Sequence, residues 1–437
     1  MRDYNILEFG ARPDGESVNT REIQAAIDAC QGGRVVIPAG TFVSGALFLH
    51  SDMTLYLEEG AVLLGSGETE DYPLYRYRFE GREQLCHASL INSSDIRDLE
   101  WDGSHGASGY LEGGRRLKNI VIAGSGTIDG NGSVLKRKEL QENRGVRGRT
   151  VALRNVDGLS ISGVTVRHSP AWCVHVIYCT DVTLKNVTIC SKYAADGSRY
   201  DVFNGDGFDP DSCRNVTVEK CVIESQDDCI AIKSGRDEEG RRVGIPTENV
   251  VITDCIFRYG FGVAVGSEMS GGVRHVLVRD CVFEDTHSLG SIKAPRGRGG
   301  VIEDIVYKNI THRNQNAEQK DCKWFRGAVY IDQFYSHDVF DTENKETPDG
   351  GTPLIRDITF ENVTTETAAG NAIYLVGLPE QCLKDIRLVN VTAHGKTGMT
   401  AANIEGLVME NVTVAADEGE AVTERNVRRN ADTGKNH

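Results

Sequence analysis

Residues 278–283 read VRDCVF, and this alternation of apolar and polar residues around an Asn or Cys recurs along the chain. The copies are LKNVTI (184–189), VEKCVI (218–223), ITDCIF (252–257), VRDCVF (278–283), VYKNIT (306–311), FENVTT (360–365), LVNVTA (388–393) and MENVTV (409–414). We place the repeated residue at Asn186, Cys221, Cys255, Cys281, Asn309, Asn362, Asn390 and Asn411. One interval, of 53 residues, is either two periods or one period with a polar insertion around residues 336–352.

A period of this size, with strands and no helices between the copies, indicates a solenoid. One turn cannot bury its own apolar face, so successive turns stack and share a core. We therefore predict an all-β fold, a single-stranded right-handed parallel β-helix that forms one domain over residues 1–415. Asn at a repeated corner would form a hydrogen-bonded ladder. For this reason we interpret the Asn-Val-Thr triplets at Asn186, Asn215 and Asn362 as corners, not as glycan acceptors.

The two ends of the chain depart from the repeat. Near the N-terminus, Asn19 and Glu22 have the spacing of a capping box. The helix that they would start carries its apolar residues on one face, at Ile23, Ala26, Ile27 and Cys30. Such a helix would cap the exposed edge of the first turn. Residues 416–437 are polar and aperiodic, so we predict a disordered tail there.

The composition limits the classes of function. The 437 residues carry a formal net charge of −16, which argues against a nucleic-acid partner. No apolar run has the length of a membrane span or a signal peptide, and the 12 cysteines lack metal-type spacing. We therefore expect a cytoplasmic protein with no membrane partner, metal or cofactor. The oligomeric state is left open.

Two acidic segments carry the candidate chemistry. The segment NGDGFD contains Asp206 and Asp209, and QDDC, about one turn later, contains Asp227 and Asp228. Matching positions on successive turns lie about 4.8 Å apart, so these carboxylates would form one cluster. Glycoside hydrolysis needs one protonated carboxyl group and one carboxylate, and crowded aspartates favour keeping one proton.

The cluster has neighbours suited to an acidic sugar. Lys293 would offer a cation to a sugar carboxylate, and Arg296 and Arg298 are weaker candidates. An isolated acidic pair is more often a solvated corner, or a calcium site as in pectate lyases. Here two Gly-rich turns follow the aspartates and leave room for a sugar ring, which favours a hydrolytic site.

At these residues the chain resembles the polygalacturonase family of glycoside hydrolases, over most of residues 5–415. Several sequence blocks of the family resemble segments of this chain. The block Asn-x-Asp-Gly-Ile-Asp resembles residues 204–209, and Gly-Asp-Asp-Cys resembles residues 226–229. Gly-His-Gly with Gly-Ser-Glu-Met-Ser-Gly-Gly resembles residues 260–262 with 266–272, Arg-Ile-Lys resembles residues 291–293, and Gln-Asp-Tyr resembles residues 333–335. SPAWCVHV, residues 169–176, resembles a segment that lines the family's substrate cleft.

The resemblance implies an inverting, metal-free hydrolysis. Asp227 would be the general acid, and Asp206 and Asp228 would hold and deprotonate the attacking water. Lys293 and Tyr335 would contact the sugars that flank the cleaved bond. The substrate-binding residues implied in this way are Asn204, Lys293, Tyr335, Phe261, Gly262, Ser291, His175 and Glu268.

Two departures from the family blocks bear on the substrate. Phe261 stands where the family has His, and Ser291 stands where it has Arg. Ser cannot make the bidentate contact that Arg makes with a carboxylate. Members that act on rhamnogalacturonan share both losses and keep the lysine. We therefore expect galacturonate on one side of the cleaved bond and a neutral sugar such as rhamnose on the other.

The resulting hypothesis is an exo-acting hydrolase of imported pectic oligosaccharides. Insertions at residues 70–118 and 313–352 would close one end of the cleft. The alternatives are an exo-polygalacturonase that acts on homogalacturonan oligosaccharides, a pectate-lyase-like β-helix, and a non-catalytic carbohydrate-binding β-helix.

Overall fold

The computed structural model describes residues 2–98, 115–136, 147–193, 197–198, 200, 202–315, 325–335 and 340–430. The chain forms two compact units, Met1–Asp227 and Asp228–His437, and each unit is described by itself. That the two units form the single domain expected from the repeat stays a prediction.

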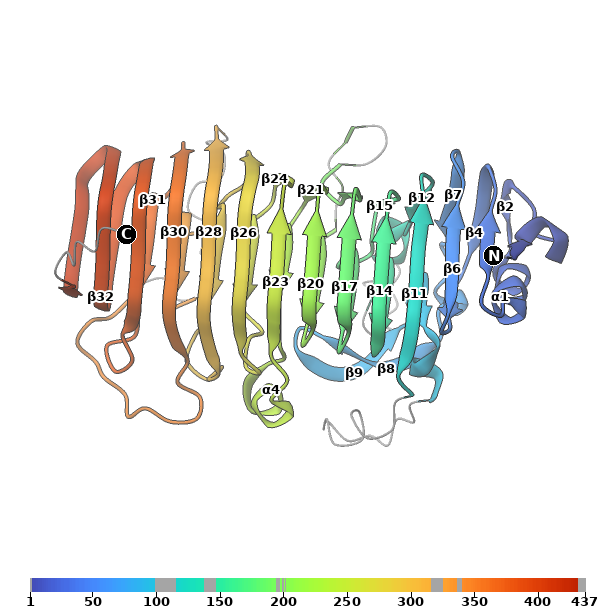
Figure 1. The fold of residues 1–437 in the computed structure, drawn as a ribbon, viewed down its shortest axis with the longest axis horizontal. Helices are drawn as coiled ribbons and strands as arrows, with labels where there is room; N and C mark the ends of the chain where they lie inside the picture. Colours follow the sequence, from blue (N-terminus) through green and yellow to red (C-terminus); the bar gives the residue numbers. More distant parts are fainter. Residues whose placement is uncertain are drawn as a thin grey trace. The chain divides into compact units, whose positions relative to one another are not determined.

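In the first unit, parallel strands stack in three columns, and each strand pairs with those one turn before and after (Figure 1). One column consists of β1 (Asp3–Asn5), β3 (Arg34–Ile37), β6 (Met53–Leu57), β11 (Leu117–Gly124), β14 (Val156–Ser162), β17 (Thr180–Lys185) and β20 (Arg214–Glu219). Another consists of β2 (Asp14–Val18), β4 (Gly40–Ser44), β7 (Ala61–Gly65), β12 (Thr127–Asp129), β15 (Thr165–Arg167), β18 (Thr188–Cys190) and β21 (Val222–Ser225). The third consists of β5 (Leu47–Leu49), β10 (Ile91–Ser93), β13 (Val151–Arg154), β16 (Val174–Ile177) and β19 (Phe208–Asp211). An antiparallel hairpin of β8 (Leu74–Phe79) and β9 (Arg82–His87) departs from the columns.

The second unit repeats the arrangement with longer strands. One column consists of β22 (Ile230–Ile232), β25 (Val263–Gly266), β27 (Gly290–Lys293), β29 (Gly327–Asp332) and β31 (Asn371–Val376). Another consists of β23 (Thr247–Thr253), β26 (Val273–Glu284), β28 (Val301–Asn314), β30 (Leu354–Thr367) and β32 (Leu383–Arg429), while β24 (Ile256–Tyr259) pairs with the end of β26. A helix, α4 (Asp237–Val243), follows β22. The parallel β-helix predicted from the repeat is therefore confirmed.

Alternation of side chains explains why each turn needs its neighbours. In β28, Ile305 and Tyr307 are fully buried in the core, whereas Lys308 lies on the outer side. Asn309 then takes a left-handed φ of +55°, and the chain turns so that Ile310 points inward again. Asn adopts this conformation at lower cost than most residues, because its short polar side chain can bond locally.

The predicted ladder exists, but our register at the cysteines was wrong by one residue. Because Arg279 pairs with Lys308 and Cys281 with Ile310, Asp280 and not Cys281 matches Asn309. The left-handed corner residues are Asn186 and Lys220 in the first unit and Asp254, Asp280, Asn309, Asn362, Asn390 and Asn411 in the second. Each cysteine comes one residue later and points into the core, where a small apolar side chain fits.

In the second unit the corner amides bond along the stack. Asn309 donates to Asp280 at 2.8 Å, and Asn362 donates to Asn309 at 3.0 Å. Asn390 donates to Asn362 at 3.0 Å, and Asn411 donates to Asn390 at 2.9 Å. Strand β28 pairs directly with β30, so the interval of 53 residues is one turn that carries an insertion.

The N-terminal helix, α1 (Thr20–Ala29), matches the prediction except at its cap. Its apolar face is buried, and it contacts β1, β4 and β5 beside the first turn (Figure 1). Asn19, however, makes no side-chain cap: its Oδ1 accepts from the backbone N–H of Arg12 at 2.7 Å, and its amide donates to the Ser17 carbonyl at 2.6 Å. The interpretation of Asn19 as part of a capping box was therefore wrong, because its side chain holds the preceding loop instead.

The polar C-terminal segment is also more regular than we expected. Strand β32 continues through Arg429, and the backbone N–H of Asn430 donates to the Leu407 carbonyl at 3.2 Å. The prediction of disorder is wrong for residues 416–430, because backbone pairing extends the stack without an apolar period. Residues 431–437 lie outside the described part of the chain.

Candidate active site

In the first unit, the Asp206 segment enters the third column. Strands β16 and β19 pair with His175 opposite Asp209, and the Asp206 carbonyl accepts from the backbone N–H of Cys173 at 2.8 Å. Asp206 is only 3% exposed. The segments SPAWCVHV and NGDGFD are therefore adjacent.

Asp227 lies two residues after the end of β21. The Ser225 hydroxyl donates to the Asp227 carbonyl at 2.6 Å, which fixes the turn of the backbone. Its side chain is half-buried, whereas Asp206 is buried. The backbone N–H of Gly205, beside Asp206, donates to the Gln226 Oε1 at 3.2 Å, so the Asp206 and Asp227 segments are linked.

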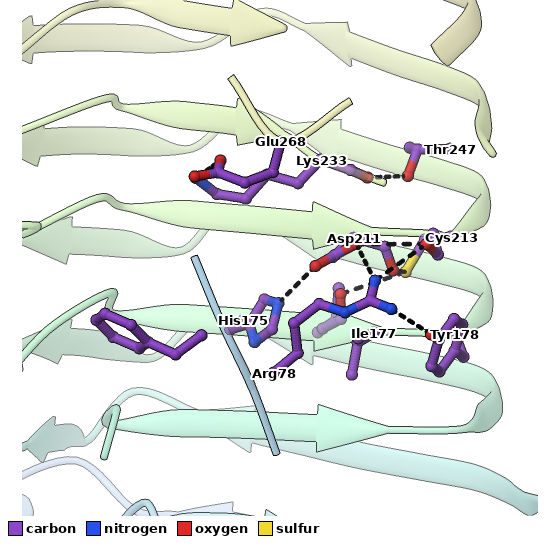
Figure 2. A network of polar contacts seen from close by, with 12 residues as sticks. Arg78, His175, Ile177, Tyr178, Asp211, Cys213, Lys233, Thr247 and Glu268 are labelled. Atoms are coloured by element: carbon purple, nitrogen blue, oxygen red, sulfur yellow. Dashed lines mark hydrogen bonds and ion pairs between the residues drawn. The ribbon is translucent and has the colours of Figure 1, made fainter. Parts of the chain in front are cut away.

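His175 does not lie where the resemblance implied. It is 0% exposed, with its ring edge-on to Trp172 at 4.9 Å and to Tyr77 at 5.5 Å. Its Nε2 lies 3.5 Å from the Asp211 Oδ2 (Figure 2). His175 is therefore a buried residue behind the Asp206 segment, and the prediction that it contacts substrate is wrong for this structure.

Beside His175 lies a buried ionic network that sequence reasoning missed. Arg78, from β8, donates to the Asp211 Oδ1 at 2.9 Å and to the Tyr178 hydroxyl at 2.5 Å (Figure 2). Its Nε also lies 3.3 Å from Glu83 of β9. The ionic network holds the hairpin against the strand that follows Asp206. The signal in the sequence was the set of four charged residues in the two strands of the hairpin, Arg76, Arg78, Arg82 and Glu83.

In the second unit, the structure brings four of the predicted residues together. The Lys293 Nζ lies 2.6 Å from the Asp228 Oδ2, and both side chains are almost fully buried. The same Nζ is 5.9 Å from the Phe261 ring centroid and 5.6 Å from that of Tyr335. Lys293, which we expected to bind a sugar carboxylate, thus pairs with Asp228, a predicted catalytic residue, and lies near two aromatic rings.

Phe261, at the position of the family histidine, belongs to an aromatic stack. Its ring lies parallel to His287, with centroids 4.4 Å apart, and His287 meets Phe325 edge-on at 5.5 Å. The neighbouring Gly262 has a φ of +68°, and a Cβ there would lie 2.2 Å from the Ser288 carbonyl oxygen. Gly262 is buried and is required by the backbone, rather than by a contact with sugar.

Ser291 is closed off from solvent. It is 0% exposed and pairs with Ala264 on one side and Tyr330 on the other. Residues two apart in a strand point to the same face, so Ser291 and Lys293 share a face. Because Ser291 has no exposed surface in this structure, its predicted direct contact with sugar finds no support here.

Glu268 forms a buried pair that we had not foreseen. Its Oε2 lies 3.2 Å from the Lys233 Nζ, and Figure 2 shows the two side chains together. Burial raises the pKa of Glu268, but the charges of Lys233 and Arg298 outweigh burial, so that the pKa is lowered from its usual value. Glu268 is therefore an anion held by protein cations. Arg296, by contrast, binds Glu380 through two bonds of 2.6 and 2.9 Å.

Within the described ranges, no group of three or more His, Cys, Asp or Glu side chains is arranged to hold a metal ion. In the same part of the chain, no helix has the length and apolar character needed to cross a membrane.

The first unit carries Asp206 and Asp227 on linked segments, and the second unit pairs Asp228 with a lysine near two aromatic rings. Carboxylates of this kind are the groups that cleave glycosidic bonds, and the protein is a glycoside hydrolase. The chain belongs to glycosyl hydrolases family 28, whose model matches residues 97–416. It is 30% identical over 420 residues to a probable polygalacturonase of Vitis vinifera, covering 92% of this chain and 77% of that protein. It is also 30% identical over 417 residues to an exo-poly-α-D-galacturonosidase of Dickeya chrysanthemi, covering 85% of this chain and 64% of that protein.

Solved structures show the same fold. A family 28 exopolygalacturonase of Yersinia enterocolitica superimposes with a TM-score of 0.80 at 24% identity, covering 100% of this chain and 79% of that one. A hyperthermoactive exopolygalacturonase of Thermotoga maritima gives a TM-score of 0.72 at 25% identity, covering 94% and 92%.

Proposed function

We propose that this glycoside hydrolase is an inverting, exo-acting enzyme that cleaves galacturonosyl linkages in pectic oligosaccharides. Galacturonate lies on one side of the cleaved bond and a neutral sugar such as rhamnose lies on the other. Asp227 donates a proton to the leaving oxygen, while Asp206 and Asp228 hold and deprotonate the attacking water. The half-buried position of Asp227 supports the first role, because the acid must reach the leaving group.

The single observation that carries the choice of sugar is that Ser291, at the position of the family arginine, is fully buried. The family's Arg-Ile-Lys block meets galacturonate carboxylates with two cations, but only Lys293 of that pair is present here. Tyr330 pairs opposite Ser291 on the next strand, and both residues are fully buried. The aromatic rings of Phe261 and Tyr335 near Lys293 suit a sugar that presents an apolar face.

A specific observation also favours a second candidate, an exo-polygalacturonase that acts on homogalacturonan oligosaccharides. The Dickeya relative is named as an exo-poly-α-D-galacturonosidase. Exo action would follow if the insertions at residues 70–118 and 313–352 closed one end of the cleft. Residues 99–114, 316–324 and 336–339 of these insertions lie outside the described part of the chain.

The deciding experiment offers the protein defined oligogalacturonides and rhamnogalacturonan oligosaccharides, and identifies the products by mass. We expect cleavage of the mixed-sugar substrates, with one end unit released at a time and the product anomer inverted in a proton NMR time course. Cleavage of oligogalacturonides alone would contradict our interpretation of Ser291 and establish the second candidate. Products that absorb in the near ultraviolet and form only with calcium would instead show a lyase.

The cellular site belongs to the same proposal. A cytoplasmic enzyme would meet oligosaccharides only after their import, which agrees with exo action on short chains. Cell fractionation with antibodies against the native protein tests this point. Activity recovered from the medium of intact cells would contradict it.

A further inference from the structure

The segment Phe203–Asp206 carries two predicted site residues, Asn204 and Asp206, yet it belongs to no strand. The preceding strand ends at Cys190, and β19 begins only at Phe208. Asn204 holds a left-handed φ of +54°, which Asn adopts at lower cost than most residues. The position of the segment must therefore come from contacts with other parts of the first unit.

Arg147 holds one side of this segment. Its guanidinium donates to the Phe203 carbonyl at 2.9 Å, to the Asn204 Oδ1 at 3.1 Å and to the Pro170 carbonyl at 2.9 Å. It also lies over the Phe203 ring, with Cζ 4.1 Å from the centroid. An arginine can only donate, so it selects the oxygen of the Asn204 amide and directs the NH₂ group away from itself.

Gln226 and Ser191 hold the other side. The Gly205 N–H donates to the Gln226 Oε1 at 3.2 Å, and the Ser191 hydroxyl donates to the Gly205 carbonyl at 2.5 Å. The backbone N–H of Gln226 in turn donates to the Ser191 Oγ at 3.1 Å. The two segments are closely packed, because a Cβ added at Gly205 would lie only 3.1 Å from the Cβ of Gln226.

Gln226 is also a departure from the family block, in which a glycine precedes the aspartate pair. A glycine has no side chain to reach Gly205. In this chain, Gln226 is the covalent neighbour of Asp227 and a hydrogen-bond partner of the residue next to Asp206. The side chain thus joins the two segments that carry the proposed acid and one of the proposed water-holding carboxylates.

We propose that Arg147 and Gln226 are positioning residues that clamp the segment Phe203–Asp206 from two sides and so set the placement of Asp206 relative to Asp227. The inference rests on the proposed hydrolysis. A displacement of about 1 Å between reacting groups can cost roughly a hundredfold in rate, so a clamp of this kind affects turnover more than binding.

The test of the clamp compares Gln226→Ala, Gln226→Glu and Arg147→Lys in the full-length protein. We expect Gln226→Ala to lower kcat roughly tenfold or more while KM stays within about twofold. Gln226→Glu keeps an acceptor for the Gly205 N–H and should recover most of kcat. Its new charge beside Asp227 should move the alkaline limb of the pH profile to higher pH. Arg147→Lys has no planar fork for three acceptors and should lower kcat/KM.

Gln24 supplies a matched control. Its Oε1 accepts from the backbone N–H of Phe48 at 2.9 Å, the same type of bond, at the N-terminal helix. Gln24→Ala should leave kcat unchanged. A loss of kcat in Gln24→Ala equal to that in Gln226→Ala, or a Gln226→Ala variant that keeps the kcat of the parent, would overturn the positioning role.

Amide hydrogen exchange of a peptide that covers residues 202–208 provides a measurement independent of activity. In Gln226→Ala and Arg147→Lys this peptide should exchange roughly tenfold faster than in the parent, while peptides of α1 stay unchanged. If the parent cleaves no pectic oligosaccharide, the proposed function fails, and the exchange rates still decide whether the clamp exists. If the parent is active but exchange and kcat are both unaltered by the substitutions, the clamp alone is refuted.

Discussion

At the scale of single residues, Asp227 differs from its two partners by being half-buried, whereas Asp206 and Asp228 are each 3% exposed. Substitution Asp227→Asn keeps the shape and removes the proton that the leaving oxygen needs. We expect kcat to fall roughly 10²–10⁴-fold on oligosaccharides. The fall should be smaller on an aryl galacturonide, whose leaving group needs no proton. Equal losses on both substrates would contradict the role of general acid.

The ion pair of Lys293 with Asp228 is buried and short, at 2.6 Å. Removing one partner leaves the other charge buried without its counter-ion, which typically costs about 3–5 kcal/mol, whereas replacing both partners costs much less. We therefore expect Lys293→Met to lower the melting temperature more than the double variant Lys293→Met/Asp228→Asn does. Thermal unfolding of the parent, the two single variants and the double variant completes the cycle. Additive losses would show that the pair is not coupled.

At the scale of elements, the corner ladder supports each turn through one residue. Asn362 both donates to Asn309 and accepts from Asn390, each at 3.0 Å, with a φ of +54°. Asn362→Ala loses both bonds and the local bonding that lets Asn adopt this left-handed φ at low cost, so it should cost about 2–3 kcal/mol. Asn362→Gly loses the bonds but not the conformation, so it should be less destabilised by about 1 kcal/mol. Melting temperatures of both variants test this, and a Gly variant less stable than the Ala variant would disprove the backbone argument.

The same corners show what the sequence could and could not predict about elements. The alternation of apolar and polar residues predicted the strands, because a turn with one buried face needs an apolar side chain at every second position. It did not distinguish Asp280 from Cys281, since both are short residues beside an apolar run and only strand pairing sets the register. The predicted cap of α1 was wrong for a similar reason. Asn19 has capping-box spacing, but its side-chain amide bonds to an N–H and a carbonyl of the preceding loop instead of to the helix.

At the scale of the whole molecule, contacts between turns of the stack could be anticipated from the repeat, whereas contacts made by the hairpin that interrupts it could not. Lys293 and Asp228 are 65 positions apart and meet because strands stack in a fixed period. Arg78 and Asp211, 133 positions apart, meet through a hairpin that interrupts the period, so no repeat pattern could reveal them. That hairpin also explains the burial of His175, which sequence resemblance placed in the cleft.

The stability of the second unit against acid should depend on one buried histidine. His312 is 1% exposed, and its ring nitrogens lie 2.7 Å from the Thr365 hydroxyl and 2.9 Å from the Thr286 carbonyl. Burial lowers the pKa of His312 from 6.5 to about 4, against a smaller opposing effect of the Thr286 carbonyl. Below pH 6.5, His312 therefore binds a proton in the unfolded chain but not in the folded chain. The free energy of unfolding accordingly falls as the pH falls toward 4.

This contribution can be separated from that of the carboxylates. Asp129 and Glu268 have lowered pKa values, so the stability that they supply is lost only below the usual carboxylate range. Between pH 6.5 and 5, His312 alone should remove about 2 kcal/mol. In His312→Gln the melting temperature should vary less over this window than in the parent. His275→Gln, at an exposed imidazole, should not flatten the profile. A parent profile that is level from pH 7 to 5, or unchanged in His312→Gln, would show that the buried ring is protonated without cost to the fold.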